Sequence, residues 1–168
     1  MLVEDVVSYL EMKSLEELRP ARDRGAEVEL REVSDVDTIR AVHDRVAGPY
    51  GWMSLAWTAE KWRESLDRPG VRTWVPRVGG ADAGFALLCF DPGGDVEIDF
   101  FGLAPEFTGR GLGGHFLTVV TRTAWEAGAT RVWLRTSSHD HPHAKASYEA
   151  RGFRLFKTET RERVLVTP

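Results

Sequence analysis

The sequence predicts one mixed α/β domain around a twisted sheet, and three observations support this prediction. The chain has 168 residues, 42% of them hydrophobic, which suits one sizeable core. From Glu27 on, strand and helix patterns follow in the order β-α-α-β-β-β-α-β-α-β-β. A cluster of glycines, Gly109, Gly111, Gly113 and Gly114, marks one strand-to-helix junction.

The N-terminal half begins with an extension, 1–26, in which 3–12 can be a short strand or a helix and 14–20 forms one helical turn ended by Pro20. The domain itself is expected to span 27–168. Its first elements are a strand at 26–33, a helix at 35–47 capped by Ser34 or Asp35, a helix at 58–66 capped by Thr58, and paired strands at 71–78 and 81–92.

The C-terminal half alternates strands with helices. The expected elements are a strand at 96–104, a helix from the glycine cluster to about Gly128, a strand at 131–137, a helix at 142–152, and two closing strands at 153–159 and 161–167.

Composition limits the function classes. The formal net charge of −4, with acidic and basic residues mixed along the chain, provides no general attraction to nucleic acid or to an anionic membrane. Apolar runs stay well below the ~20 residues of a membrane helix, and the first residues do not form an export signal. Cys89, the one cysteine, cannot form an internal disulfide. We therefore expect a cytoplasmic protein, monomeric or homodimeric.

The glycine cluster allows several interpretations. A nucleoside triphosphate loop needs Lys-Ser/Thr after its last glycine, whereas here His115 and Phe116 follow. A dinucleotide fingerprint fits only through Gly109, Gly111 and Gly114, and it follows strands that look antiparallel. A pyrophosphate cradle at a helix N-terminus fits better, because free N–H groups and the helix dipole face an anion there. A tight turn without ligand is the remaining alternative.

Two motifs resemble those of the GNAT superfamily of acyl-CoA-dependent N-acyltransferases. "PEFTGRGLGG" is similar to the family's Gln/Arg-x-x-Gly-x-Gly/Ala loop, with Thr108 at the first position. "HPHAKASYEARGF" is similar to a second family segment, in which His141 replaces the common Asn and Ala144, Tyr148, Gly152 and Phe153 are in register. The resemblance covers about 27–166. It implies a mostly antiparallel sheet that splays between two central parallel strands, with helices on both faces.

The resemblance also implies how acetyl-CoA would bind. The strand before the loop would bond the pantetheine arm through backbone groups of Phe101, Gly102 and Leu103. The loop amides would hold the pyrophosphate, and Arg110 would add positive charge there unless it is a plain surface residue. The binding residues expected in the two motifs are Thr108, Gly109, Arg110, Gly111, Leu112, Gly113, Gly114, His141 and Ala144.

Acyl transfer to an amine needs a proton acceptor and a donor to the leaving thiolate. The resemblance places the Tyr148 phenol beside the thioester sulfur, although a purely structural tyrosine is the alternative. Glu97 lies where histone-type members carry a base, and Asp99, two residues on, shares its strand face. Glu97 could act as the base, anchor a cationic amine, or lie on an outer face; Asp99 is a candidate substrate contact.

The resemblance implies that the loop between the first two helices forms a wall of the acceptor site; in this loop Tyr50 and Trp52 follow Gly48-Pro49. A hydrophobic lid without selectivity is the alternative. His139 ends a strand that faces the same site. The histidines of "SSHDHPHA" lack the second ligand segment of a zinc site, so no metal is expected.

The predicted function is transfer of an acetyl group from acetyl-CoA to a primary amine of a small molecule, peptide or protein, by direct attack in a ternary complex. The alternative is a catalytically silent acyl-CoA-binding or interaction module on the same fold.

Overall fold

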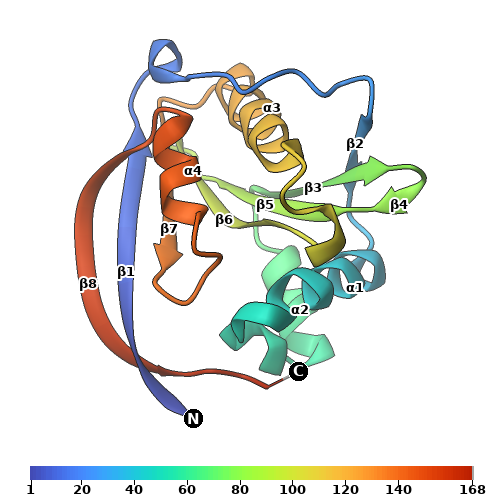
Figure 1. Cartoon of the computed structure of the whole chain (residues 1–168), viewed down its shortest axis with the longest axis vertical. Helices are drawn as coiled ribbons and strands as arrows, with labels where there is room; N and C mark the ends of the chain where they lie inside the picture. The colour runs from blue at the N-terminus through green and yellow to red at the C-terminus, as the bar shows by residue number, and fades with distance from the viewer. Residues whose placement is uncertain (168) are drawn as a thin grey trace.

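The computed structural model describes residues 1–167, and within them one sheet is flanked by helices (Figure 1). Its strands are β1 (Leu2–Met12), β2 (Val28–Val33), β3 (Val71–Val78), β4 (Ala81–Asp82), β5 (Gly84–Phe90), β6 (Asp95–Leu103), β7 (Arg131–Ser137) and β8 (Arg154–Val164). Its α-helices are α1 (Val36–Ala47), α2 (Ala59–Leu66), α3 (Leu112–Glu126) and α4 (Ala144–Ala150). The predicted caps of α1 and α2 are confirmed, because the Asp35 and Thr58 side chains accept from backbone N–H groups of the first turns.

The strand order is β2-β3-β5-β6-β7-β1-β8, with β4 paired to β3. Neighbouring strands are antiparallel except β6 and β7, which are parallel. Helices cover both faces: α3 and α4 pack on one core cluster around Phe116 and Ile98, and α1 and α2 pack on another around Trp62 and Phe85. The predicted fold class is confirmed. Within residues 1–167, no helix is both long and apolar enough to cross a membrane.

The N-terminal segment belongs to the sheet. Residues 2–12, for which strand and helix were both open, form β1, and 15–17 form one 3-10 turn. Strand β1 lies between β7 and β8 and is antiparallel to both, as Figure 1 shows at the left edge of the molecule. The sheet therefore includes residues that the sequence treated as an extension.

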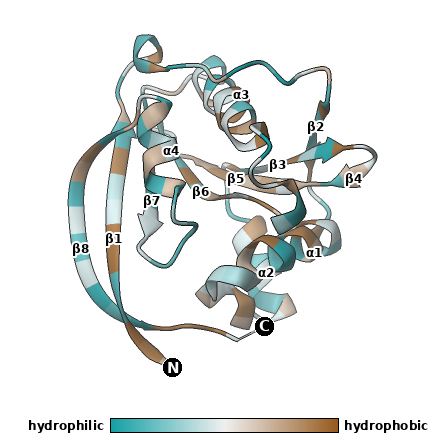
Figure 2. Ribbon diagram, viewed as in Figure 1, coloured by the Kyte–Doolittle hydropathy of each residue, from teal (hydrophilic) through white to brown (hydrophobic). Residues whose placement is uncertain are grey.

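Two strand predictions were wrong. Residues 81–92 form two strands instead of one, because Pro76 in the paired strand β3 has no N–H group with which to continue the ladder. The two closing strands are one, β8, which pairs with β1 along its length. The sequence there has no glycine or proline to end a strand, and Figure 2 shows most of β8 as hydrophilic, with hydrophobic residues near its two ends. Pro168 of the predicted domain lies outside the described residues.

Candidate active site

The centre of the sheet opens between its two parallel strands. Strands β6 and β7 are paired only from Asp95 with Arg131 to Ile98 with Leu134. Beyond that point β6 stays with β5, and β7 stays with β1. Asp99 is the extra residue of a β-bulge in β6, since Leu87 pairs with Phe100 and Leu88 with Ile98. The splay that the resemblance implied is therefore present, and it leaves the 99–103 edge of β6 without a β7 partner.

The glycine turn leads from β6 into α3. Gly109 and Gly111 have φ values of 74° and 76°, a region that side chains other than glycine rarely adopt. Gly111 caps α3 without a side-chain hydrogen bond, so the N–H groups of the first turn keep their capacity to bind an anion. A Cβ atom on Gly109 would meet no neighbour within 4 Å, so the turn is open at that residue.

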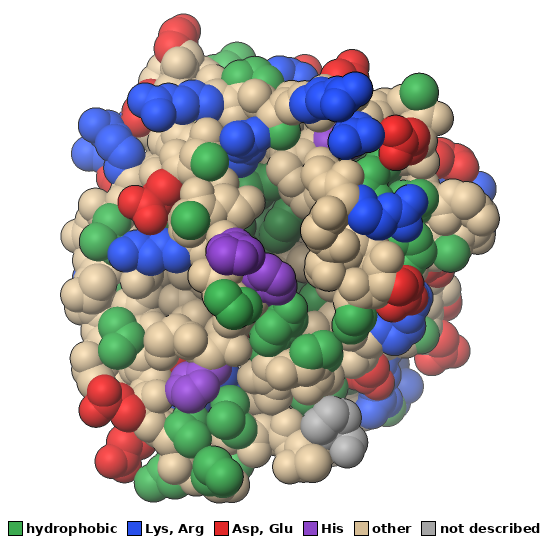
Figure 3. All heavy atoms as spheres, in the orientation of Figure 1, with side chains coloured by type: hydrophobic (Ala, Val, Ile, Leu, Met, Phe, Trp, Pro, Cys, Tyr) green, Lys and Arg blue, Asp and Glu red, His purple; other side chains and the backbone are tan. Residues whose placement is uncertain are grey.

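A cavity of about 430 Å³ lies along this turn. Its lining includes ten of the twelve expected binding residues: Phe101, Gly102, Leu103, Thr108, Gly109, Gly111, Gly113, Gly114, His141 and Ala144. His143 and Tyr50 line it as well. Figure 3 shows a hollow in this face of the molecule, with histidine side chains at its rim. The apolar walls and the uncapped helix suit a long chain that ends in phosphates.

Two expected binding residues lie elsewhere. The Leu112 side chain is buried in a small core under the turn, so only its backbone can face a ligand. Arg110 lines neither this cavity nor the second one described below, and its guanidinium lies 5.7 Å from the centre of the Phe107 ring. Other arginines approach the start of α3: a Cβ atom on Gly111 would lie 3.2 Å from Nη2 of Arg24. Sequence reasoning missed Arg24 because it is distant in the chain from the motif.

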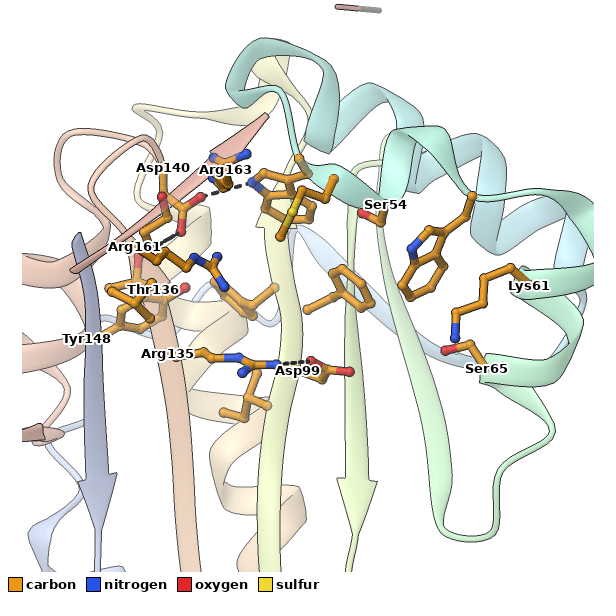
Figure 4. A pocket seen from close by; sticks show the side chains of 18 of the residues that line it. Ser54, Lys61, Ser65, Asp99, Arg135, Thr136, Asp140, Tyr148, Arg161 and Arg163 are labelled. Atoms are coloured by element: carbon orange, nitrogen blue, oxygen red, sulfur yellow. Dashed lines mark hydrogen bonds and ion pairs between the residues drawn. The ribbon is translucent and has the colours of Figure 1, made fainter. Parts of the chain in front are cut away.

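A second cavity, of about 540 Å³, opens on the α1 and α2 side of the splay (Figure 4). Trp52, Phe101, Asp140 and Tyr148 line both cavities, so the two meet there. Of the expected acceptor contacts, Trp52 and Asp99 line the second cavity. Tyr50 lines only the first, because the loop after α1 directs it toward His141, 6.3 Å away between ring centres.

His139 is a further departure from expectation. It lines neither cavity, and its Nε2 lies 2.7 Å from the backbone oxygen of Glu4 in β1. His141 and His143 stay close to each other, with ring centres 5.4 Å apart, and Nδ1 of His141 accepts from the His143 amide at 3.0 Å. Within the described residues, no three His, Cys, Asp or Glu side chains gather as a metal site requires.

Asp140 organises the wall between the cavities. Its carboxylate accepts from Trp52 Nε1 at 3.0 Å, from Thr136 Oγ1 at 2.8 Å and from the Ser137 amide at 2.9 Å. These bonds hold the aromatic loop after α1 to the end of β7. The sequence offered a signal for this role, a carboxylate just after a strand that faces the site, but it did not reveal the tryptophan partner.

Tyr148 lies at the junction of the cavities. Helix α4 buries it beside Phe101, with ring centres 6.2 Å apart. Burial, with a smaller effect of the Asp140 charge, raises the pKa of the Tyr148 phenol strongly. The phenol therefore keeps its proton at all ordinary pH values and can donate a hydrogen bond to a group in either cavity.

Two carboxyl groups share the α1 and α2 face of β6. Burial, reinforced by the Asp99 charge, raises the pKa of Glu97 from 4.5 to about 7. Burial also raises the pKa of Asp99. Arg135 offsets these effects only in part, since its Nε lies 3.7 Å from Glu97 Oε2 and its Nη2 4.0 Å from Asp99. Glu97 lines neither cavity, and its buried Oε2 has no hydrogen-bond partner among the described residues.

Residues 39–153 match the family model described as Acetyltransferase (GNAT) family. The match spans more than half of the chain. The chain belongs to the GNAT family.

Named relatives agree with this membership. The chain is 29% identical over 103 residues to proteins of Mycobacterium tuberculosis and Mycobacterium bovis named as uncharacterized N-acetyltransferases. The match covers 61% of this chain and 65% of each relative, so it spans just under two thirds of the relatives' length.

Solved structures show the same GNAT fold. A GCN5-related N-acetyltransferase from Sphaerobacter thermophilus has a TM-score of 0.71 at 18% identity, covering 97% of this chain and 52% of that one. Another from Kribbella flavida has a TM-score of 0.66 at 19% identity, covering 96% and 58%. At such low sequence identities, the structural similarity is evidence for the fold alone.

Proposed function

We propose that this GNAT chain transfers the acetyl group of acetyl-CoA to a primary amine, with donor and acceptor meeting at Tyr148. One observation carries the proposal: two neighbouring cavities at the opened sheet share Tyr148, Phe101, Trp52 and Asp140. A donor in one cavity and an amine in the other can therefore react directly, without a covalent enzyme intermediate.

The first cavity is the donor site. The free edge of β6 at Phe101, Gly102 and Leu103 offers backbone groups to the pantetheine amides. The uncapped amides of α3 suit the pyrophosphate. Arg24 lines neither cavity and its Nη1 pairs with Glu27, but its Nη2 lies near Gly111, and we assign to it the positive charge that the sequence assigned to Arg110.

We assign proton removal from the amine to the two carboxyl groups of Glu97 and Asp99. A base works best when its pKa is near the working pH, and the Glu97 pKa of about 7 meets that condition. Because Asp99 lines the acceptor cavity and Glu97 does not, the proton reaches Glu97 through Asp99 or a water molecule. In the alternative role the pair holds a cationic amine by charge alone.

The bond changes then follow. The amine nitrogen attacks the acetyl carbonyl carbon, a C–N bond forms, and the C–S bond breaks with its electron pair left on sulfur. The Tyr148 O–H acts as the general acid by donating a hydrogen bond to that sulfur. Because its pKa is raised, the phenol stabilises the developing thiolate chiefly as a hydrogen-bond donor.

The test is release of free thiol from acetyl-CoA in the presence of a pool of primary amines, with acetyl-CoA binding followed by calorimetry. Binding with amine-dependent thiol release supports the transferase. Binding with no release from any amine would support the alternative, a catalytically silent acyl-CoA-binding module.

Kinetics of two variants separate the roles of the carboxyl pair. If Glu97 is the base, Glu97→Gln lowers kcat and saturating amine does not restore it. If the pair is an anchor, Glu97→Gln and Asp99→Asn both raise the amine KM instead.

A further inference from the structure

The acceptor cavity carries an excess of positive charge. Its lining includes five basic side chains: Lys61, Arg68, Arg135, Arg161 and Arg163. Only two carboxylates, Asp99 and Asp140, line it with them. A cavity designed for a polycationic amine would show the opposite balance.

Most of these charges already have protein partners. Arg68 and Arg135 both approach Asp99, with nitrogen to oxygen distances of 3.8 and 4.0 Å. Lys61 pairs with no carboxylate among the described residues, and its Nζ lies 5.4 Å from the centre of the Trp57 ring.

Positive charge exceeds negative charge in a partly buried group of side chains at another wall of the cavity, where β8 meets β1. One fully buried carboxylate, Asp5, accepts from Arg161 Nε at 2.9 Å and from Arg163 Nε at 3.0 Å. The Ser137 hydroxyl also donates to Asp5. Two guanidinium groups and one carboxylate leave one positive charge unbalanced.

That charge faces the cavity at Arg161. The Arg163 side chain is only 4% exposed, and its Nη1 donates to the backbone oxygen of Gly51 at 2.9 Å. The Arg161 side chain is 42% exposed, and Asp5 is its only hydrogen-bond acceptor within residues 1–167. In Figure 4 it extends from the side of Tyr148 and Thr136 toward the middle of the cavity. Asp5 therefore fixes the guanidinium while its terminal nitrogens remain available.

We propose that the acceptor is an amine that also carries a carboxylate, as an α-amino acid does, and that Arg161 binds this carboxylate. The inference rests on the proposed acetyl transfer and names its substrate class. The one unbalanced charge of the Asp5 group matches a singly charged carboxylate, and a planar guanidinium can bind its two oxygens together. Trp52, Trp57 and Phe100 line the same cavity and suit an apolar or aromatic side chain.

The experiment compares matched acceptors. Each common L-amino acid is assayed beside its carboxamide, which keeps the amine and side chain but removes the negative charge. Carboxamide amines are less basic and so more often neutral, which biases the comparison against the prediction. We expect at least one amino acid to exceed its carboxamide by about 10- to 100-fold in kcat/KM, mainly through KM.

Arg161→Gln should remove most of that preference and leave turnover of the carboxamide little changed. Arg161→Lys should restore it in part, because the charge returns without the planar fork. Arg154→Gln is the matched control on β8: Arg154 pairs with Glu17 outside both cavities, so the preference should persist. Thermal unfolding of each variant verifies that the Asp5 group is still folded.

The outcomes separate the two proposals. Equal rates for acids and carboxamides, or a preference that survives in folded Arg161→Gln, would overturn the carboxylate inference and leave acetyl transfer intact. No turnover with any amino acid would overturn it as well. The proposed function itself fails only if the wider amine pool also releases no thiol.

Discussion

Replacing Glu97 with Gln should stabilise the protein above neutral pH while impairing its activity. Burial and the Asp99 charge raise the Glu97 pKa from 4.5 to about 7, so the folded protein resists ionisation of this group. Since each pKa unit is worth ~1.4 kcal/mol, ionised Glu97 costs about 3 kcal/mol of unfolding free energy. Glutamine keeps the shape of the side chain but cannot ionise.

The sign of the effect depends on pH. A group whose folded pKa is raised contributes its full stability below the unfolded value of 4.5, and that contribution is lost as pH rises through about 7. The stability advantage of Glu97→Gln should therefore be small near pH 4.5, grow between 4.5 and 7, and level off at about 3 kcal/mol above about pH 8.

The assay is urea unfolding followed by tryptophan fluorescence at a series of pH values. Glu64→Gln, at an exposed position of α2, is the matched control and should show no such growth. A Glu97→Gln advantage that does not change with pH, or a variant less stable than the parent above pH 8, would refute the reasoning. Asp99→Asn should lower the Glu97 pKa, because it removes a like charge, and should move the acidic limb of the activity profile to lower pH.

Five further variants, in three experiments, test the donor site. Tyr148→Phe should lower kcat by about 10- to 1000-fold with acetyl-CoA affinity little changed; unchanged kcat would make Tyr148 structural. Gly111→Ala should weaken acetyl-CoA binding in calorimetry more than Thr108→Ala, because alanine is strained at a φ of 76°; near-native affinity of the glycine variant would contradict the cradle. Arg24→Gln should weaken acetyl-CoA binding about 3- to 10-fold and Arg110→Gln less, and the reverse order would return the phosphate role to Arg110.

The fold was predictable where local chemistry decides it. The caps Asp35 and Thr58, the alternating strands and the glycine cluster each act within a few residues, and all are present in the structure. The type of the 3–12 segment was not predictable, because β1 is a strand through its pairing with β7 and β8, both more than a hundred residues away. The break at Ala83 likewise depends on Pro76 in the paired strand.

The donor cavity was predictable from local sequence, whereas the acceptor cavity was not. Residues within the two motifs line the donor cavity, since a contiguous turn and helix present them together. The acceptor cavity instead combines side chains from β1, β6, β7, β8 and α2, which no local pattern links. One signal was available: Arg161 and Arg163 alternate in "RERV" and so share a strand face. Their partner Asp5 lies at the other end of the chain, and only the fold brings it to them.

The central claim, direct transfer between two cavities that meet at Tyr148, is tested most directly by following a labelled acetyl group. Acetyl-CoA labelled in its acetyl carbons is incubated with the protein and an amine acceptor, and the products are separated by mass spectrometry. We expect the label to appear on the amine nitrogen in proportion to the thiol released, and Tyr148→Phe to slow both together. Label recovered only as free acetate, or retained in acetyl-CoA despite tight binding, would contradict it.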